Sequence, residues 1–137
     1  MKKLTKGFKK NEGFTLMEII IVIVILGILA LIAVPRLIGF TTQAEKATDK
    51  EYAAVVARAA ELYWASNEQP ATIDITDIDT STGDGLVEDW DDALQYYNNS
   101  EPDISISNGV ATVTIYGDGE SVSYTSPTGY TETVSGG

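Results

Sequence analysis

The sequence has no cysteine and no histidine among its 137 residues. Without cysteine, no disulfide closes a loop and no thiolate can act as a nucleophile or metal ligand. Without histidine, the chain lacks the imidazole that most often serves as a general base or zinc ligand. These two absences remove most common catalytic sites, so we expect a chain that is not an enzyme.

Positive charge is also scarce, with 9 Lys and Arg against 20 Asp and Glu and a formal net charge of -11. The imbalance is uneven, because residues 1–13 hold five lysines and one glutamate, which gives +4 there and leaves -15 on the rest. An acidic remainder of this kind argues against nucleic acid as a partner and favours solubility through self-repulsion. The length has room for one membrane segment and one small domain.

A long apolar run follows the basic residues. Residues 14–34 are apolar except for Thr15 and Glu18, and as a helix rising about 1.5 Å per residue they match a hydrocarbon core of roughly 30 Å. We therefore expect residues 14–35 to span a membrane, with the lysine-rich N-terminus on the cytoplasmic side. A carboxylate in such a segment costs about 2.5–3.5 kcal/mol on insertion scales, so Glu18 calls for a partner of opposite charge.

The segment around Glu18 resembles the class III signal and N-terminal helix of type IV pilins and their pseudopilin relatives. The resemblance rests on Lys9-Lys10, on Gly13-Phe14-Thr15-Leu16-Met17-Glu18, on Gly27 and on the closing Ala33-Val34-Pro35. It implies that residues 1–13 are a leader, which a membrane aspartyl peptidase removes after Gly13. The same enzyme would N-methylate the new N-terminal residue, Phe14.

Cleavage at this point would give Glu18 its partner. The new α-amino group of Phe14 would be a cation one helical turn from Glu18. If mature subunits pack side by side with a small axial offset, Glu18 of one subunit pairs with the Phe14 amine of its neighbour, and the pair fixes the register. The alternative is a glutamate that only complements the helix dipole, worth about 0.3–1 kcal/mol. Phe14 and Glu18 are thus the predicted assembly residues.

Gly27 and Pro35 are the predicted helix break. Pro35 removes one backbone hydrogen bond and clashes with the carbonyl of Leu31, so a kink or local unwinding is expected between Gly27 and Pro35. The resemblance implies that this stretch melts as subunits pass from the bilayer to the filament. The sequence alone does not distinguish an ordinary kink in a membrane helix from melting of this stretch during assembly.

Residues 36–137 are predicted to form a globular domain. Residues 36–67 continue the helix, with one apolar stripe that we expect to lie on a small sheet: Tyr52, Val55, Val56, Ala59, Leu62 and Tyr63. Alternating residues at 104–134 predict an antiparallel sheet of three or four strands, with Asn108-Gly109 as a hairpin turn and 130–134 as an edge strand. The expected fold class is α+β, with a long N-terminal helix whose C-terminal half packs on the sheet.

Residues 71–103 are acidic and irregular. Asp77, Asp79 and Glu88 fall at positions 1, 3 and 12 of a calcium-loop pattern, but Thr82 stands at the sixth position, where the EF-hand turn requires glycine. We therefore expect a solvated acidic loop and no cofactor, with calcium as the alternative. The aromatic segment that follows contributes three expected core residues, Trp90, Leu94 and Tyr96.

Together these features predict a structural subunit of a type IV pilus filament that serves adhesion, motility or DNA uptake. The resemblance implies a precursor embedded in membrane lipid, a prepilin peptidase and methyltransferase, and an extracellular homopolymer built by an assembly ATPase and a membrane platform protein.

Three alternatives stay open. The first is a pseudopilin of a type II secretion or competence system, and the second is an anchored binding domain that never polymerises. The third is an electron-conducting filament, which the aromatic residues along the helix suggest: Phe14, Phe40, Tyr52, Tyr63 and Trp64.

Overall fold

The computed structural model describes residues 13–80 and 85–134. The basic leader up to residue 12 and residues 81–84 of the acidic loop lie outside the described residues. The chain divides into two compact units, Met1–Gly39 and Phe40–Gly137. One helix, α1 (Leu16–Ser66), contributes to both units.

Helix α1 begins where Thr15 caps it. The backbone N–H of Glu18 donates to the Thr15 hydroxyl at 3.3 Å and to the Thr15 carbonyl at 3.1 Å. A hydroxyl at this position satisfies an N–H group that has no partner inside the helix. Phe14 therefore precedes the first helical residue, Leu16, and the helix begins two residues later than the predicted start at residue 14.

The apolar part of α1 is continuous and exposed. It stays helical through Gly27 and Pro35, so local unwinding is absent from this described helix, and melting during assembly stays a prediction. Its large apolar side chains between Phe14 and Phe40 are 42–79% exposed. Among the described residues, α1 is the helix with the length and apolar composition to cross a membrane.

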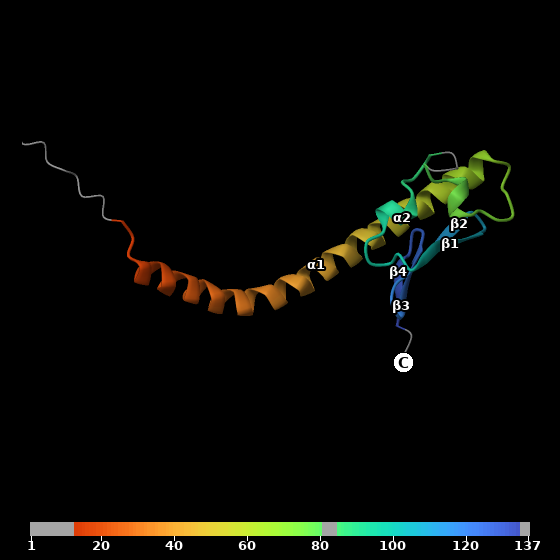
Figure 1. Ribbon diagram of the computed structural model, residues 1–137. Coiled ribbons are helices and arrows are strands. Elements are labelled where there is room, and N and C mark those ends of the chain that lie inside the picture. The colour runs from red at the N-terminus through yellow and green to blue at the C-terminus, as the bar shows by residue number, and fades with distance from the viewer. Residues whose placement is uncertain (1–12, 81–84, 135–137) are drawn as a thin grey trace, which may run out of the picture. The chain divides into compact units, whose positions relative to one another are not determined.

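The globular unit contains a four-stranded antiparallel sheet (Figure 1), as the alternating sequence predicts. Its strands are β1 (Ser100–Ser107), β2 (Val110–Tyr116), β3 (Glu120–Thr125) and β4 (Gly129–Val134), ordered β1-β2-β3-β4. Asn108 and Gly109 have φ of 53° and 78°, which is the backbone of a tight hairpin turn. The sheet begins at Ser100, four residues earlier than predicted, because Pro102 and a register shift between Ser100 and Asp103 mask the alternation.

Two short helices lie in the region predicted to be irregular. They are η1 (Ile75–Asp77), a 3-10 turn, and α2 (Trp90–Ala93). Asp89 starts α2, since its side chain accepts a hydrogen bond from the Asp91 N–H at 3.3 Å. Figure 1 shows α2 and the sheet beside the C-terminal part of α1 within the globular unit.

The face of α1 that enters the core is built mainly from alanine. Ala53, Val56, Ala57 and Ala60 are fully buried and pack in one cluster with side chains of β2 and β3. Small side chains fill this face of the helix, so burial centres on them. Two residues of the predicted stripe, Val55 and Leu62, consequently lie outside the core and are 47% and 57% exposed.

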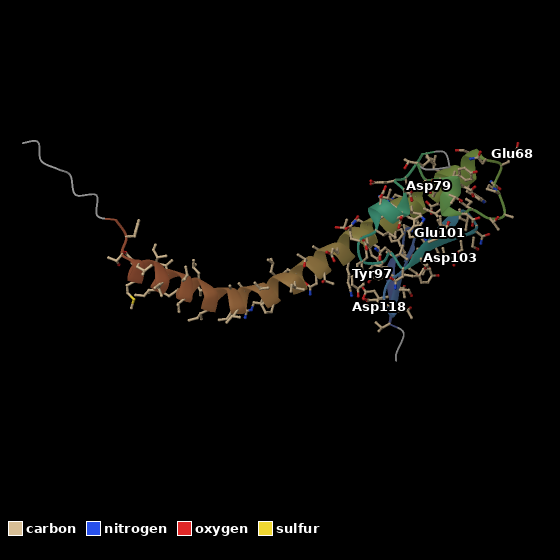
Figure 2. The ribbon with its side chains drawn as sticks, in the orientation of Figure 1. Glu68, Asp79, Tyr97, Glu101, Asp103 and Asp118 are labelled. Carbon is tan, nitrogen blue, oxygen red and sulfur yellow. The ribbon has the colours of Figure 1, made fainter. Side chains whose placement is uncertain are left out.

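The aromatic segment from Trp90 at the start of α2 to Tyr97 also differs from the prediction. Leu94 is a core residue, as expected, but Trp90 and Tyr96 are only partly buried against the core. Tyr97 is the fully enclosed aromatic residue instead, and Figure 2 labels it. Its ring lies against Gly117, where an added Cβ would approach Tyr97 to 3.0 Å, so a glycine at this turn makes room for the ring.

Candidate functional site

The predicted cleavage point lies in an accessible, non-helical segment. Gly13 and Phe14 both precede α1, and Phe14 is 79% exposed. Among the residues that the structure describes, and apart from Gly13 and its two chain neighbours, no atom lies within 4 Å of the position that a Cβ on Gly13 would occupy. The fold therefore has room for a larger side chain at position 13. Any requirement for a small residue there would come from the peptidase.

Glu18 lies in the first turn of α1 as an isolated acidic side chain. It is exposed, and within the described residues its carboxylate has no ion pair or hydrogen bond. The neighbouring Ile19 and Ile20 offer it only apolar surroundings. A carboxylate so placed can accept a cation from outside the subunit.

Thr15 belongs to this site, although the sequence-based assignment left it out. Its hydroxyl bonds the Glu18 N–H, which is half of a capping box. The pattern Thr15-x-x-Glu18 before an apolar run was the available signal. The cap fixes the first turn of α1 and so positions Glu18 at the start of the helix.

A second cluster, also missed, joins α1 to the loop between α2 and β1. Asp49 is fully buried, and its carboxylate accepts backbone N–H bonds from Gln95 (3.0 Å), Tyr96 (2.7 Å) and Tyr97 (2.8 Å). These three bonds satisfy a buried negative charge without a cation. Asp49 is therefore a structural residue that positions Tyr97 in the core.

The structure does not bring the candidate calcium ligands Asp77, Asp79 and Glu88 together as one site. The Asp77 carboxylate accepts the N–H of Asp74 at 2.9 Å within η1, while Asp79 (labelled in Figure 2) is 1% exposed and Glu88 is exposed. Within residues 13–80 and 85–134, no group of three His, Cys, Asp or Glu side chains is arranged to hold a metal. Thr82 of the loop pattern lies outside the described residues, and calcium binding stays untested.

The chain is similar to a known family at its N-terminal segment, and to several known proteins. Residues 8–34 match the family described as the prokaryotic N-terminal methylation motif. The chain is 53% identical over 47 residues to a type IV narrow pilus major component of Thermus thermophilus, covering 34% of this chain and 40% of the relative. It is 36% identical over 69 residues to the type II secretion system core protein G of Vibrio cholerae, covering 50% of this chain and 47% of the relative.

A core protein G of the type II secretion system of Pseudomonas aeruginosa is 39% identical over 59 residues, or 43% of this chain and 42% of the relative. The chain thus spans less than half the length of these curated relatives. No solved structure matches it. The relatives are a pilus component and secretion-system core proteins. The methylation motif is a site on which an enzyme acts.

The apolar helix and the pilus relative are consistent with membrane anchoring and an extracellular filament. The methylation motif, the similarity to pilin and pseudopilin relatives, and a long N-terminal helix followed by a four-stranded antiparallel sheet support a type IV pilin or pseudopilin.

Proposed function

We propose that this chain is a structural subunit of a type IV pilus filament, which polymerises through α1 after cleavage between Gly13 and Phe14 and N-methylation of Phe14. One observation carries the proposal. The apolar part of α1 is exposed along its length, and a single carboxylate, Glu18, interrupts it near the start. A soluble monomer rarely leaves so much contiguous apolar surface uncovered.

Two environments in turn would cover that surface. Before assembly it faces lipid, with the lysine-rich leader holding the N-terminus in the cytoplasm. After assembly it faces the helices of other subunits. Since both environments are dry, moving the helix between them gains little hydrophobic free energy. We therefore assign the work of extraction to an assembly ATPase and a membrane platform protein.

Glu18 would set the geometry of the polymer. Its carboxylate accepts a hydrogen bond from the Phe14 amine of the neighbouring subunit, and the attraction between the two charges offsets part of their desolvation cost. A buried pair of this kind adds little net stability, but it penalises every register in which either charge is left alone. The pair therefore selects one arrangement of neighbouring helices.

The second candidate is a pseudopilin of a type II secretion or competence system, because several relatives are core proteins of type II secretion. Both candidates share processing at Gly13 and pairing at Glu18. They differ in whether the polymer extends from the cell surface as a filament, and in whether deleting the gene abolishes surface filaments or protein secretion. An anchored binding domain that never polymerises differs from both, because it makes Glu18 dispensable.

Shearing and deletion separate these candidates. Surface filaments are sheared from cells, imaged, and analysed by intact-mass spectrometry; we expect this chain as the main component, beginning at N-methyl-Phe14. Deleting the gene should remove the filaments. Loss of protein secretion with surface filaments intact would favour the pseudopilin, and a processed chain that stays unassembled in the membrane would contradict both.

A further inference from the structure

The face of α1 that points away from the core carries a regular pattern. We call it the outer stripe; its seven residues are exposed and follow one another at alternating steps of four and three: Ala44, Thr48, Glu51, Val55, Arg58, Leu62 and Ala65. Steps that average 3.5 residues keep side chains on one face of a helix and are typical of helices that pack along each other.

The core of the subunit does not bury the outer stripe. The buried residues of α1, including Ala53, Val56 and Ala60, lie between the stripe positions and face the core. Val55 and Leu62 are 47% and 57% exposed, although both are large apolar residues within the globular unit. The stripe also combines small, apolar and charged residues, which suits a contact between helices.

The two charges on the stripe have opposite signs and lie one heptad apart. Seven helical residues separate Glu51 from Arg58 by about 10.5 Å along the axis. Neither forms an ion pair within the part of the chain that the structure describes. Both act on Tyr130 of β4: burial is the main cause of the raised pKa of its phenol, Glu51 raises that pKa further, and Arg58 opposes the rise.

We propose that the outer stripe packs against the outer stripe of a second copy of this chain, parallel and displaced by seven residues, so that Arg58 of one copy pairs with Glu51 of the next. This inference rests on the proposed function, since it concerns subunits in a polymer. The charges of Glu51 and Arg58 favour a displacement of seven residues. A parallel pair without displacement would place Glu51 against Glu51 and Arg58 against Arg58, and like charges across an interface are costly.

An antiparallel pair would also bring the two charges together, but it conflicts with assembly from one membrane. Subunits that share the orientation of their N-termini in the bilayer enter the polymer parallel. The parallel displaced pair is then the arrangement that matches opposite charges along the stripe and keeps Val55 and Leu62 at the contact.

The start of α1 accommodates the same displacement. Two helical steps separate Glu18 from Leu16, or about 3 Å, and two non-helical residues ahead of Leu16 reach at most about 7 Å. The Phe14 amine can therefore lie up to about 10 Å along the axis from Glu18 of its own chain. Had the helix begun at Phe14, that distance would be only about 6 Å.

The absence of native cysteine permits a direct test in the full chain. Glu51→Cys and Arg58→Cys are introduced together and the filaments are oxidised. Cα atoms about 10.5 Å apart within one helix cannot form a disulfide, whose Cα atoms lie within about 7 Å, so every cross-link joins two copies. We expect a ladder of multimers on a denaturing gel.

Three controls define the contact. Either single cysteine variant should give no ladder, since the displacement separates equal positions by one heptad. The pair Glu45→Cys with Arg58→Cys should also give none, because Glu45 is exposed but off the stripe. Wild-type filaments with no ladder from the 51/58 pair would overturn the stripe contact while leaving the proposed function standing. Absence of wild-type filaments would overturn both.

If the cysteine variants assemble poorly, a charge swap tests the same pairing of Glu51 with Arg58. Glu51→Arg alone should lower filament yield by about tenfold or more, because it places two arginines at the contact. Combining it with Arg58→Glu restores the opposite signs and should return the yield to near that of the wild type. A swap that assembles no better than the single reversal would contradict the pairing.

Discussion

Replacing Asp49 should destabilise the globular unit more than any exposed acidic substitution. In Asp49→Ala, three backbone N–H groups lose their acceptor; the N–H of Tyr97 is buried, and those of Gln95 and Tyr96 are partly buried. A buried unsatisfied donor costs about 1–3 kcal/mol. Counting one full penalty and two reduced ones, we expect a loss of about 3–5 kcal/mol from the free energy of unfolding.

Asp49→Asn should cost less for a reason visible in the geometry. Oδ2 of Asp49 accepts from both Tyr96 and Tyr97, while Oδ1 accepts only from Gln95. An asparagine that places its oxygen at the Oδ2 position keeps two of the three bonds. We therefore expect a loss of about 1–2 kcal/mol. Asp118→Ala, an exposed control, should change stability by less than about 0.5 kcal/mol.

The assay is denaturant unfolding of the full chain in detergent, followed by tryptophan fluorescence. Trp64 and Trp90 both pack against the core, so their emission reports the globular unit rather than the apolar part of α1. An Asp49→Ala protein as stable as the Asp118→Ala control would refute the assigned role of the three N–H bonds.

Further predictions concern processing, calcium and pH. Gly13→Arg should leave an uncleaved, unmethylated precursor; a mature Phe14 terminus by intact mass would remove the assigned site. Adding calcium should leave the melting temperature unchanged. If calcium did bind, a concentration of 100 times its Kd would raise the free energy of unfolding by about 2.7 kcal/mol. A rise in melting temperature that is lost in Asp79→Ala would contradict this prediction. Lys46 and Tyr96 bond Glu120 and hold its pKa below 4.5, so this stabilisation is present above pH 4.5 and lost on acidification through the lowered pKa. Melting temperatures of Glu120→Gln should therefore fall less on acidification, and an unchanged pH profile would contradict the pairing.

Local patterns in the sequence predicted the helix and most of the sheet. The apolar run and the alanine-rich continuation after it require a helix, and α1 extends to Ser66. Asn108-Gly109 between two alternating segments specified the β1–β2 hairpin, because two successive residues with positive φ form its turn. Each of these signals lies within a few residues of the structure that it determines.

Features that depend on tertiary packing were not predictable in the same way. Asp49 lies 46 residues before Gln95, and nothing local indicates that its side chain accepts three N–H bonds from that loop. The choice of core face on α1 likewise depended on which side of the helix the sheet and the loops cover. Hydrophobicity alone favoured Val55 and Leu62, whereas close packing buried alanines and left those two side chains outside.

At the N-terminus the candidate functional residues could be predicted from the sequence because they lie within one short motif. Gly13, Phe14 and Glu18 follow from one short motif, and the structure adds the Thr15 cap and a helix start at Leu16. Their roles in cleavage, methylation and pairing remain predictions, since each involves a second molecule.

The central claim is that Glu18 is an assembly residue and not a residue for folding or insertion. Its most direct test is the filament yield of Glu18→Val. The substitution removes a costly group from the membrane segment, so the precursor should insert and be cleaved after Gly13 at least as well as the wild type. Polymerisation should fail or fall steeply, because the neighbour's Phe14 amine is buried without its partner, at a cost of about 3–5 kcal/mol.

Glu18→Asp keeps the charge but shortens its reach, so its yield should be intermediate. Sheared filaments are quantified against the processed protein that remains in the membrane. We expect processed Glu18→Val protein in the membrane and almost none in filaments. A normal filament yield from processed Glu18→Val protein would contradict the pairing of Glu18 with Phe14.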